Sequence, residues 1–211
     1  HTKGSRWLPA YEVFGEGVFF RLCEGELVKW ENLPGVLDRT AKLRHSQEVS
    51  DLGKGLPKVT PRLVMLHTLS HLIMCEMAHT AGYSAASLGE RIYSGEAGAG
   101  HHGMAGVLIY TAAGDSEGTL GGLARLGETG EFAPIVLAAL ERALFCSLDP
   151  VCRELPSQGM DGLNLAACHA CALLPETSCE WRNCLLDRAL VVSAGPGAHP
   201  PGFMDSLLDS G

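Results

Sequence analysis

Six of the eight cysteines lie within positions 146–184, and Cys168 and Cys171 form a C-x2-C pair. Two intervening residues allow both sulfurs to face one metal ion at about 2.3 Å. Two further cysteines lie at suitable loop distances on either side of this pair. The predicted ligands of a tetrahedral Zn²⁺ are therefore Cys152, Cys168, Cys171 and Cys179, with Cys146 as the substitute for Cys152. Such a site would be structural, because a full set of thiolates leaves no open position for water.

Free thiols and redox chemistry fit these cysteines less well than a metal ion does. Free buried thiols behave as small hydrophobic residues, but six within so short a segment favour a common ligand. A redox C-x2-C pair is expected to open a helix after a strand, and the sequence around Cys168 lacks that pattern. His169 is a weaker candidate ligand than the cysteines. The sequence shows no secretion signal, so metal is favoured over disulfides.

A second set of metal-binding residue types follows one face of a predicted helix. His67, His71, Cys75 and His79 recur at four-residue steps, which brings their side chains to the same side. This spacing is compatible with a metal site, and it is equally typical of buried, hydrogen-bonded histidines. The HxxxH pattern lacks the central Glu of zinc proteases. We therefore expect core or interface histidines here.

A glycine-rich segment from Gly114 to Gly122 contains the sequence GDSEG, which places Ser116 between acidic residues. A nucleophilic serine requires a neighbouring base, and His67 or His71 would have to supply it. We expect this segment to be a tight loop in which Asp and Ser form hydrogen bonds with the backbone. A hydrolase that uses Ser116 is the alternative hypothesis. The segment has no Lys and no P-loop signature, so we expect no ATP hydrolysis by this chain alone.

Charge is distributed unevenly over the 211 residues. Residues 1–80 hold ten Lys and Arg against nine Asp and Glu, whereas residues 81–211 hold six against fifteen. Because nucleic-acid affinity depends mainly on cationic side chains, the second part is a poor binder of DNA by itself. No apolar run approaches the roughly 18 residues of a membrane-spanning helix, so we expect a cytoplasmic protein without a membrane contact. The chain starts at His1, and we expect it to be part of a longer protein.

The apolar pattern predicts both helices and strands. Residues 12–22 and 107–110 are typical of strands, whereas 60–82 and 132–146 are typical of helices, the first opened by Thr60-Pro61. Ser84 is predicted to cap a short helix that includes Leu88 and Ile92, and another helix is expected around 180–191. Residues 31–59 show no clear period and are predicted to be connecting structure. The fold class that follows is α+β, with many helices and a short β-sheet.

Four stretches of the chain resemble the C-terminal domain of the DrmB family. They are HTLSHLIM (67–74), GYSAASLGERIY (82–93), GVLIYTAAGDSEGTLGGLARLGE (106–128) and LNLAACHACALLPETSCEWRNCLLDRALVV (163–192). The resemblance covers about residues 12–30 and 60–192. The chain is also distantly similar to the zinc-binding C-terminal domain of MrfA-type helicases. By motif position, the helicase cysteines correspond to Cys168, Cys171 and Cys179, while their first cysteine falls near Asn164, which is not a zinc-ligand type.

The resemblance implies a function in a complex. DrmB proteins belong to the DISARM anti-phage defence system and act with a DrmA-like helicase on DNA. We therefore expect a non-catalytic, zinc-stabilised accessory domain that engages DNA through the complex or contacts a partner protein. The expected organisation is an N-terminal β segment with connecting structure (1–59), a zinc-binding helicase-associated domain (60–194) and a loose C-terminal tail (195–211).

Overall fold

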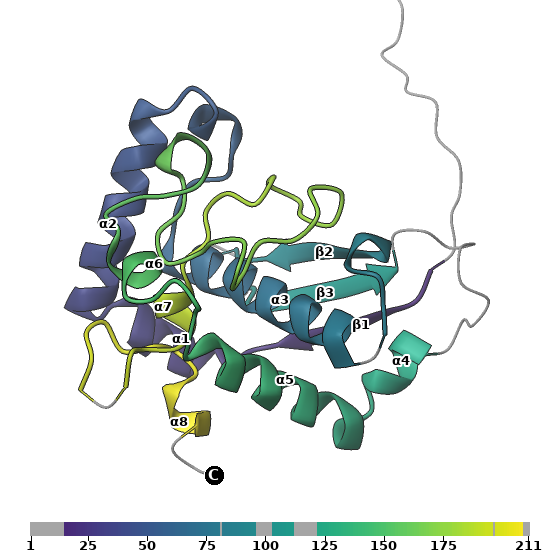
Figure 1. Ribbon diagram of the computed structural model, residues 1–211. Coiled ribbons are helices and arrows are strands. Elements are labelled where there is room, and N and C mark those ends of the chain that lie inside the picture. Colours follow the sequence, from purple (N-terminus) through teal and green to yellow (C-terminus); the bar gives the residue numbers. More distant parts are fainter. Residues whose placement is uncertain (1–14, 81, 96–102, 112–121, 196, 209–211) are drawn as a thin grey trace, which may run out of the picture.

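The computed structural model describes residues 15–80, 82–95, 103–111, 122–195 and 197–208. Within them, a three-stranded antiparallel sheet has the order β1-β3-β2 (Figure 1). The strands are β1 (Gly17–Arg21), β2 (Leu88–Tyr93) and β3 (Gly106–Thr111). Ile109 in the central strand pairs with Val18 of β1 and with Glu90 of β2. The predicted α+β class is confirmed, and both predicted strands are present.

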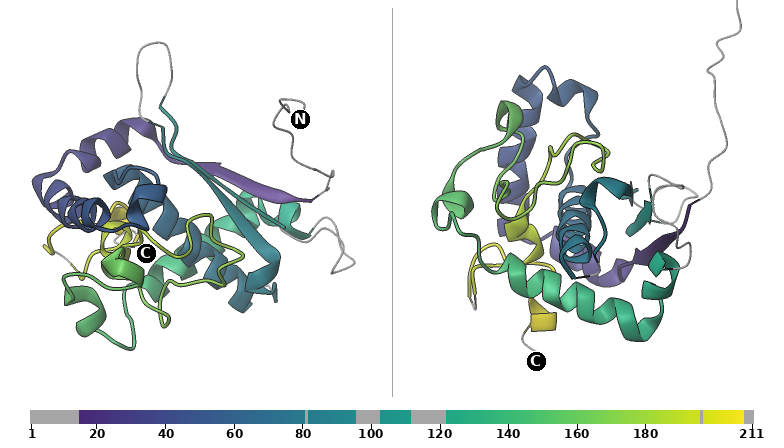
Figure 2. Two further views of the ribbon diagram at one scale, coloured as in Figure 1. Left: turned by 90° about the horizontal axis from the view of Figure 1, so that it is seen from above. Right: turned by 45° about the vertical axis from the view of Figure 1, so that its right-hand side comes forward.

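Helix α3 (Pro61–Thr80) lies at the centre of the fold. Figure 2 shows it nearly end-on in the right-hand view, with the sheet, the other long helices and the C-terminal segment around it. All residues from 61 to 74 are buried, so this helix is enclosed on every side rather than amphipathic. It starts as the sequence predicts, because Pro61 occupies the first turn and the Thr60 hydroxyl accepts a hydrogen bond from the Leu63 amide at 3.2 Å.

The remaining helices are α1 (Glu24–Glu31), α2 (Pro34–Val49), α4 (Gly122–Leu126), α5 (Thr129–Ala143), α6 (Val151–Glu154), α7 (Arg188–Val191) and α8 (Asp205–Leu208). Of these, α1, α2, α5 and α7 contact α3, whereas α4 and α8 contact α5. The long helix α5 contacts α3 and corresponds to the helix predicted over 132–146. Helix α7 also contacts α3, although the two helices are far apart in the sequence. No helix among the described residues is long and apolar enough to cross a membrane.

The prediction of connecting structure for residues 31–59 is wrong, because α2 occupies most of that segment. The buried face of α2 consists of Val36, Thr40, Leu43 and Gln47, which follow helical spacing. Two of these residues are polar, so the apolar pattern does not reveal the helix. The polar Gln47 side chain can be buried because its hydrogen bonds are satisfied: it donates to Pro57 O at 2.8 Å and accepts from the Val59 amide at 3.0 Å.

Two of the predicted helices are also wrong. Leu88 and Ile92 lie on β2 instead of a helix, since positions four apart share a face in a strand as well. The helix expected around 180–191 is limited to α7, which starts only at Arg188. Arg182, Asn183 and Leu185 have positive φ angles of 54°, 57° and 64°, and this backbone cannot continue a right-handed helix.

Candidate metal centre

The Cys168–Cys171 pair lies in a turn beside two more cysteines of the preceding segment. The sulfur atoms of Cys146, Cys152, Cys168 and Cys171 all lie within 4.8 Å of one another. The closest Sγ–Sγ distances are 3.5 Å for Cys146–Cys168, 3.7 Å for Cys168–Cys171 and 3.9 Å for Cys152–Cys171. A tetrahedron with Zn–S bonds of about 2.3 Å has sulfur–sulfur edges of about 3.8 Å. The donor set and its spacing therefore fit zinc.

Backbone geometry orients these sulfurs toward one another. Cys146 follows the end of α5, and its sulfur accepts a hydrogen bond from the Leu148 amide at 3.4 Å. Cys152 lies in the short helix α6. In the C-x2-C turn the Cys168 amide donates to the sulfur of Cys171 at 3.3 Å. Amide donors of this kind stabilise thiolate ligands, so the loop is arranged for bound metal.

The protonation of the thiols is linked to metal binding. Burial raises the pKa of the Cys152 thiol to about 11, and burial raises the pKa of the Cys171 thiol as well. Both thiols are therefore protonated near neutral pH in the absence of a cation. A metal ion would displace these protons, because thiolate is the form that binds zinc.

Three cysteines of the predicted ligand group, Cys152, Cys168 and Cys171, come together in the structure, and the fourth member is Cys146. Cys179 does not join them and lies in a different group of potential ligands. Its sulfur instead lies 3.3 Å from Nε2 of His67 in a second buried cluster. The loop that carries Cys179 is fixed by the Asn183 side chain, which donates to Leu174 O and accepts from the Leu174 amide, both at 2.8 Å.

The remaining candidate residues of the sequence have different positions. Within the described residues, His169 belongs to neither group of potential metal ligands. Of the predicted histidine stripe, His67 and His71 are fully buried, whereas Cys75 is half-buried and His79 is exposed. Ser116, with nearly all of the Gly114–Gly122 segment, lies outside the described residues, so the structure does not test the hydrolase hypothesis.

Asn164, which falls near the position of a helicase cysteine, has a structural role. Its side-chain oxygen accepts the Leu186 amide at 2.9 Å, and its side-chain nitrogen donates to Asn183 O at 2.7 Å. Asn164 is buried, so these bonds fix the segment before α7 beside the cysteine turn. The sequence contains no pattern that predicts this contact.

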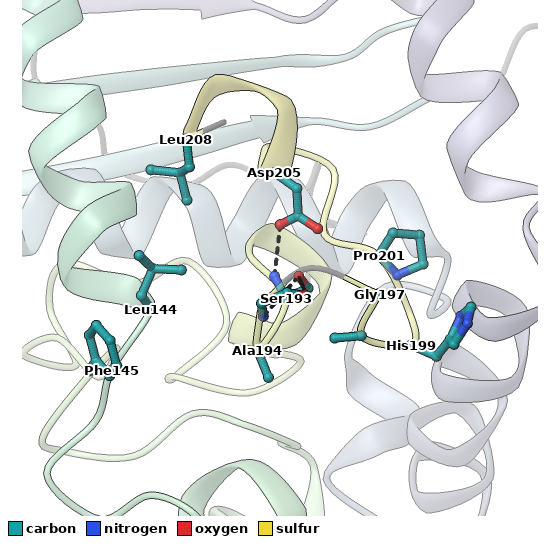
Figure 3. A pocket seen from close by; sticks show the side chains of 11 residues that line it. Leu144, Phe145, Ser193, Ala194, Gly197, His199, Pro201, Asp205 and Leu208 are labelled. Atoms are coloured by element: carbon teal, nitrogen blue, oxygen red, sulfur yellow. Dashed lines mark hydrogen bonds between the residues drawn. The ribbon is translucent and has the colours of Figure 1, made fainter. Parts of the chain in front are cut away.

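A pocket of about 540 Å³ lies between the end of α5 and the C-terminal segment (Figure 3). Its lining is mostly apolar and includes Leu144, Phe145 and Leu208. The carboxylate of Asp205 at its edge accepts the amides of Ser193 and Gly202 at 2.8 and 2.9 Å. The Asp205 carboxylate is therefore occupied by backbone amides. No cysteine of the described residues lines the pocket, so the pocket is separate from the cysteine cluster.

Comparisons with known proteins define the class of this site. Residues 69–172 match the family model described as MZB, the MrfA Zn-binding domain. This range includes the C-x2-C turn and the two cysteines that precede it. Residues 69–172 therefore resemble a zinc-binding domain of the MrfA type, and this match together with the four-cysteine cluster supports zinc as the metal.

The chain is also homologous to a protein of the DISARM system. It is 40% identical over 205 residues to the DISARM protein DrmB of Bacillus paralicheniformis, an alignment that covers 95% of this chain. The chain spans 36% of the length of that relative, so it corresponds to about a third of it. The predicted resemblance to the DrmB family is confirmed.

Proposed function

We propose that Cys146, Cys152, Cys168 and Cys171 are the four ligands of the structural zinc ion. The observation that carries this proposal is the group of four sulfurs within 4.8 Å of one another, with edges of 3.5 to 3.9 Å where they are closest. Four thiolates complete the coordination of zinc and leave no position for a reacting water molecule. The ion therefore stabilises the fold and takes no part in a reaction.

The zinc would connect three parts of the chain. Cys146 follows α5, Cys152 belongs to the four-residue helix α6, and the C-x2-C turn precedes a long loop. Between Leu144 and Arg188 regular structure is sparse, so a metal ion substitutes for the hydrophobic core of larger elements. Binding would release thiol protons and add its free energy to that of folding.

The wider function we propose is that of an accessory domain in anti-phage defence. Similarity to DISARM protein DrmB over nearly the whole chain supports this function. The domain would act beside a DrmA-like helicase and would have no catalytic activity of its own. Residues 81–211 hold fifteen acidic and six basic residues, so they suit contact with a protein partner better than with phosphate. DNA would be reached through the complex.

Metal analysis of the purified protein tests the ligand assignment. Cys152→Ser is expected to lower the zinc content by one equivalent, because three sulfurs do not complete the tetrahedron. Cys23→Ser is the matched control, since Cys23 is exposed and belongs to neither group of potential ligands. Thiol titration before and after chelation should show that the ligand cysteines react only after the metal is removed. An unchanged zinc content in Cys152→Ser would contradict the assignment.

Co-purification with a DrmA-like helicase tests the proposed partnership. The full-length protein should be retained by the helicase, and DNA should bind the complex more tightly than it binds this protein alone. Measurements at two salt concentrations separate the two contributions, because binding that depends on phosphate contacts weakens steeply with salt. Equal DNA affinity with and without the helicase would contradict an indirect DNA contact.

A further inference from the structure

We propose a second zinc site, formed by His67, His71, Glu90 and Cys179. Each of these residues offers one ligand atom, and the four atoms lie within 4.8 Å of one another. All four residues are buried. They come from α3, from β2 and from the loop before α7, so the cluster joins the central helix, the sheet and the C-terminal segment. It shares no residue with the four-cysteine site.

The distances within the cluster are close to those between the ligands of a tetrahedral ion, and slightly shorter. Oε1 of Glu90 lies 3.0 Å from Nε2 of His67 and 3.2 Å from Nε2 of His71. The sulfur of Cys179 lies 3.3 Å from Nε2 of His67. Zinc bonds of about 2.0–2.1 Å to N and O, and of about 2.3 Å to S, give ligand–ligand edges of about 3.3–3.6 Å. The two imidazoles are nearly perpendicular, with an interplanar angle of 85°, so they approach the shared centre from different directions.

The hydrogen bond at the far side of His71 identifies its free nitrogen. Nδ1 lies 2.8 Å from the carbonyl oxygen of Ala172, and a carbonyl can only accept, so Nδ1 carries the proton. In the neutral imidazole, Nε2 then presents its lone pair to the Glu90 carboxylate at 3.2 Å. Two acceptors at this distance repel unless a cation lies between them or a proton is added to the ring. A carbonyl behind the ligand nitrogen is the arrangement found in zinc-binding histidines.

Backbone and hydroxyl donors surround the other two ligands. The amides of Trp181 and Asn183 donate to the sulfur of Cys179 at 3.3 and 3.1 Å. The positive φ angle of 57° at Asn183 belongs to the turn that brings its amide to this sulfur. The second oxygen of Glu90, Oε2, accepts from the Ser70 hydroxyl at 2.5 Å, while Oε1 lies at the centre of the cluster and also accepts the Glu180 amide at 3.4 Å. These contacts hold the ligands in place in the same way as in known zinc sites.

Charge balance also favours a divalent ion in this buried position. One carboxylate and one thiolate offset the two positive charges of the ion, and two neutral imidazoles complete the coordination. On binding, the Cys179 thiol loses its proton to solvent, and two metal bonds to nitrogen, one to sulfur and one to oxygen are formed. The coordination is complete without water, so this second ion would be structural. Mixed N, O and S ligands suit a cation of intermediate softness such as Zn²⁺.

A metal-free ion pair is the competing arrangement of the same four residues. In it His71 is an imidazolium paired with the Glu90 carboxylate, and His67 donates a hydrogen bond to the same oxygen. The metal site and the ion pair predict different metal contents, because only a bound ion adds zinc to the purified protein.

The first experiment is metal analysis of the full-length protein and its variants, each loaded with Zn²⁺ and then desalted. His71→Ala and Cys179→Ala should each contain one equivalent of zinc less than the unmodified protein. Cys184→Ala is the matched control, since Cys184 is a fully buried cysteine of the same loop outside both clusters. It should keep the full content. Cys152→Ala should lose the zinc ion of the four-cysteine site instead. The double variant Cys152→Ala/Cys179→Ala should therefore lose two equivalents of zinc.

X-ray absorption at the zinc edge tests the same proposal on the unmodified protein, so it does not depend on whether the variants fold. With both sites occupied, the two ions together have five sulfur ligands and three nitrogen or oxygen ligands. The four-cysteine site alone has only sulfur neighbours. Histidine scattering at the zinc edge is therefore expected, and it should disappear in His71→Ala. If the spectrum contains only sulfur neighbours and the His71 and Cys179 variants keep all their zinc, the second site is wrong and the ion pair without metal is correct.

Discussion

Nη2 of the Arg188 guanidinium forms an ion pair with Asp149 and contacts both carboxylate oxygens, at 2.8 and 2.9 Å. The same carboxylate accepts the backbone amide of Cys146 at 2.9 Å. Arg188 is fully buried at the start of α7, and it also donates to Ala143 O at the end of α5 at 2.6 Å. One ion pair therefore joins α5, α7 and the first cysteine of the four-cysteine site.

We predict that Asp149→Ala destabilises the protein by about 3 kcal/mol, because removal of the carboxylate leaves a buried guanidinium without its charged partner. Urea denaturation of the zinc-loaded protein measures this loss. The double variant Asp149→Ala/Arg188→Met removes the buried charge as well, and it should recover part of the stability. A loss of under about 0.5 kcal/mol in Asp149→Ala would show that the pair has little influence.

The neighbouring residue Asp187 forms a second buried ion pair. Its carboxylate accepts hydrogen bonds from Nε of Arg39 at 2.5 Å and from Nη2 of Arg39 at 2.9 Å. It also accepts hydrogen bonds from the backbone amides of Ala166 and Ala189. Asp187→Ala should therefore destabilise the protein by about 3 kcal/mol, since it removes a helix cap and a buried charge together. The control is Glu26→Gln, which alters the exposed pair with Lys29. Its thermal midpoint should equal that of the unmodified protein.

Two glycines are predicted to respond in opposite directions to alanine. A Cβ at Gly202 would lie 2.6 Å from Val191 O and from Cα of Val192, so Gly202→Ala should cost about 1–3 kcal/mol. A Cβ at Gly25, inside α1, meets nothing within 4 Å. Gly25→Ala should stabilise the protein by about 0.5–1 kcal/mol through helix propensity. Chemical denaturation of both variants checks the signs, and equal shifts in the same direction would contradict the packing at Gly202.

Removal of zinc is predicted to loosen one segment before the rest. Residues 146–184 contain little regular structure, so their amides should exchange with solvent faster after chelation. The largest change is expected at the Cys171 and Ala172 amides, which donate to Cys168 O at 3.1 and 3.0 Å. Strand β3 is the internal control, because it pairs on both sides within the sheet. Uniform acceleration over the whole chain would show instead that the metal is required for the global fold.

Local patterns in the sequence are enough to predict the α+β class, the position of α3 and the presence of a zinc-binding cysteine cluster. Thr60 and Pro61 mark the start of a helix, and two residues between Cys168 and Cys171 allow both sulfurs to reach one ion. Because each of these patterns lies within a few residues, it can be recognised without knowledge of any tertiary contact.

The grouping of the cysteines depends instead on the tertiary fold. Cys146, Cys152 and Cys179 all lie within loop reach of the C-x2-C pair, so spacing could not separate them. The turn at 182–185 and the contacts of Asn183 direct Cys179 toward α3. Glu90 joins the two buried histidines of α3 because β2 packs against that helix, a relationship that no local pattern encodes. Ligands gathered from distant segments depend on how the chain packs, and packing is a property of the whole fold.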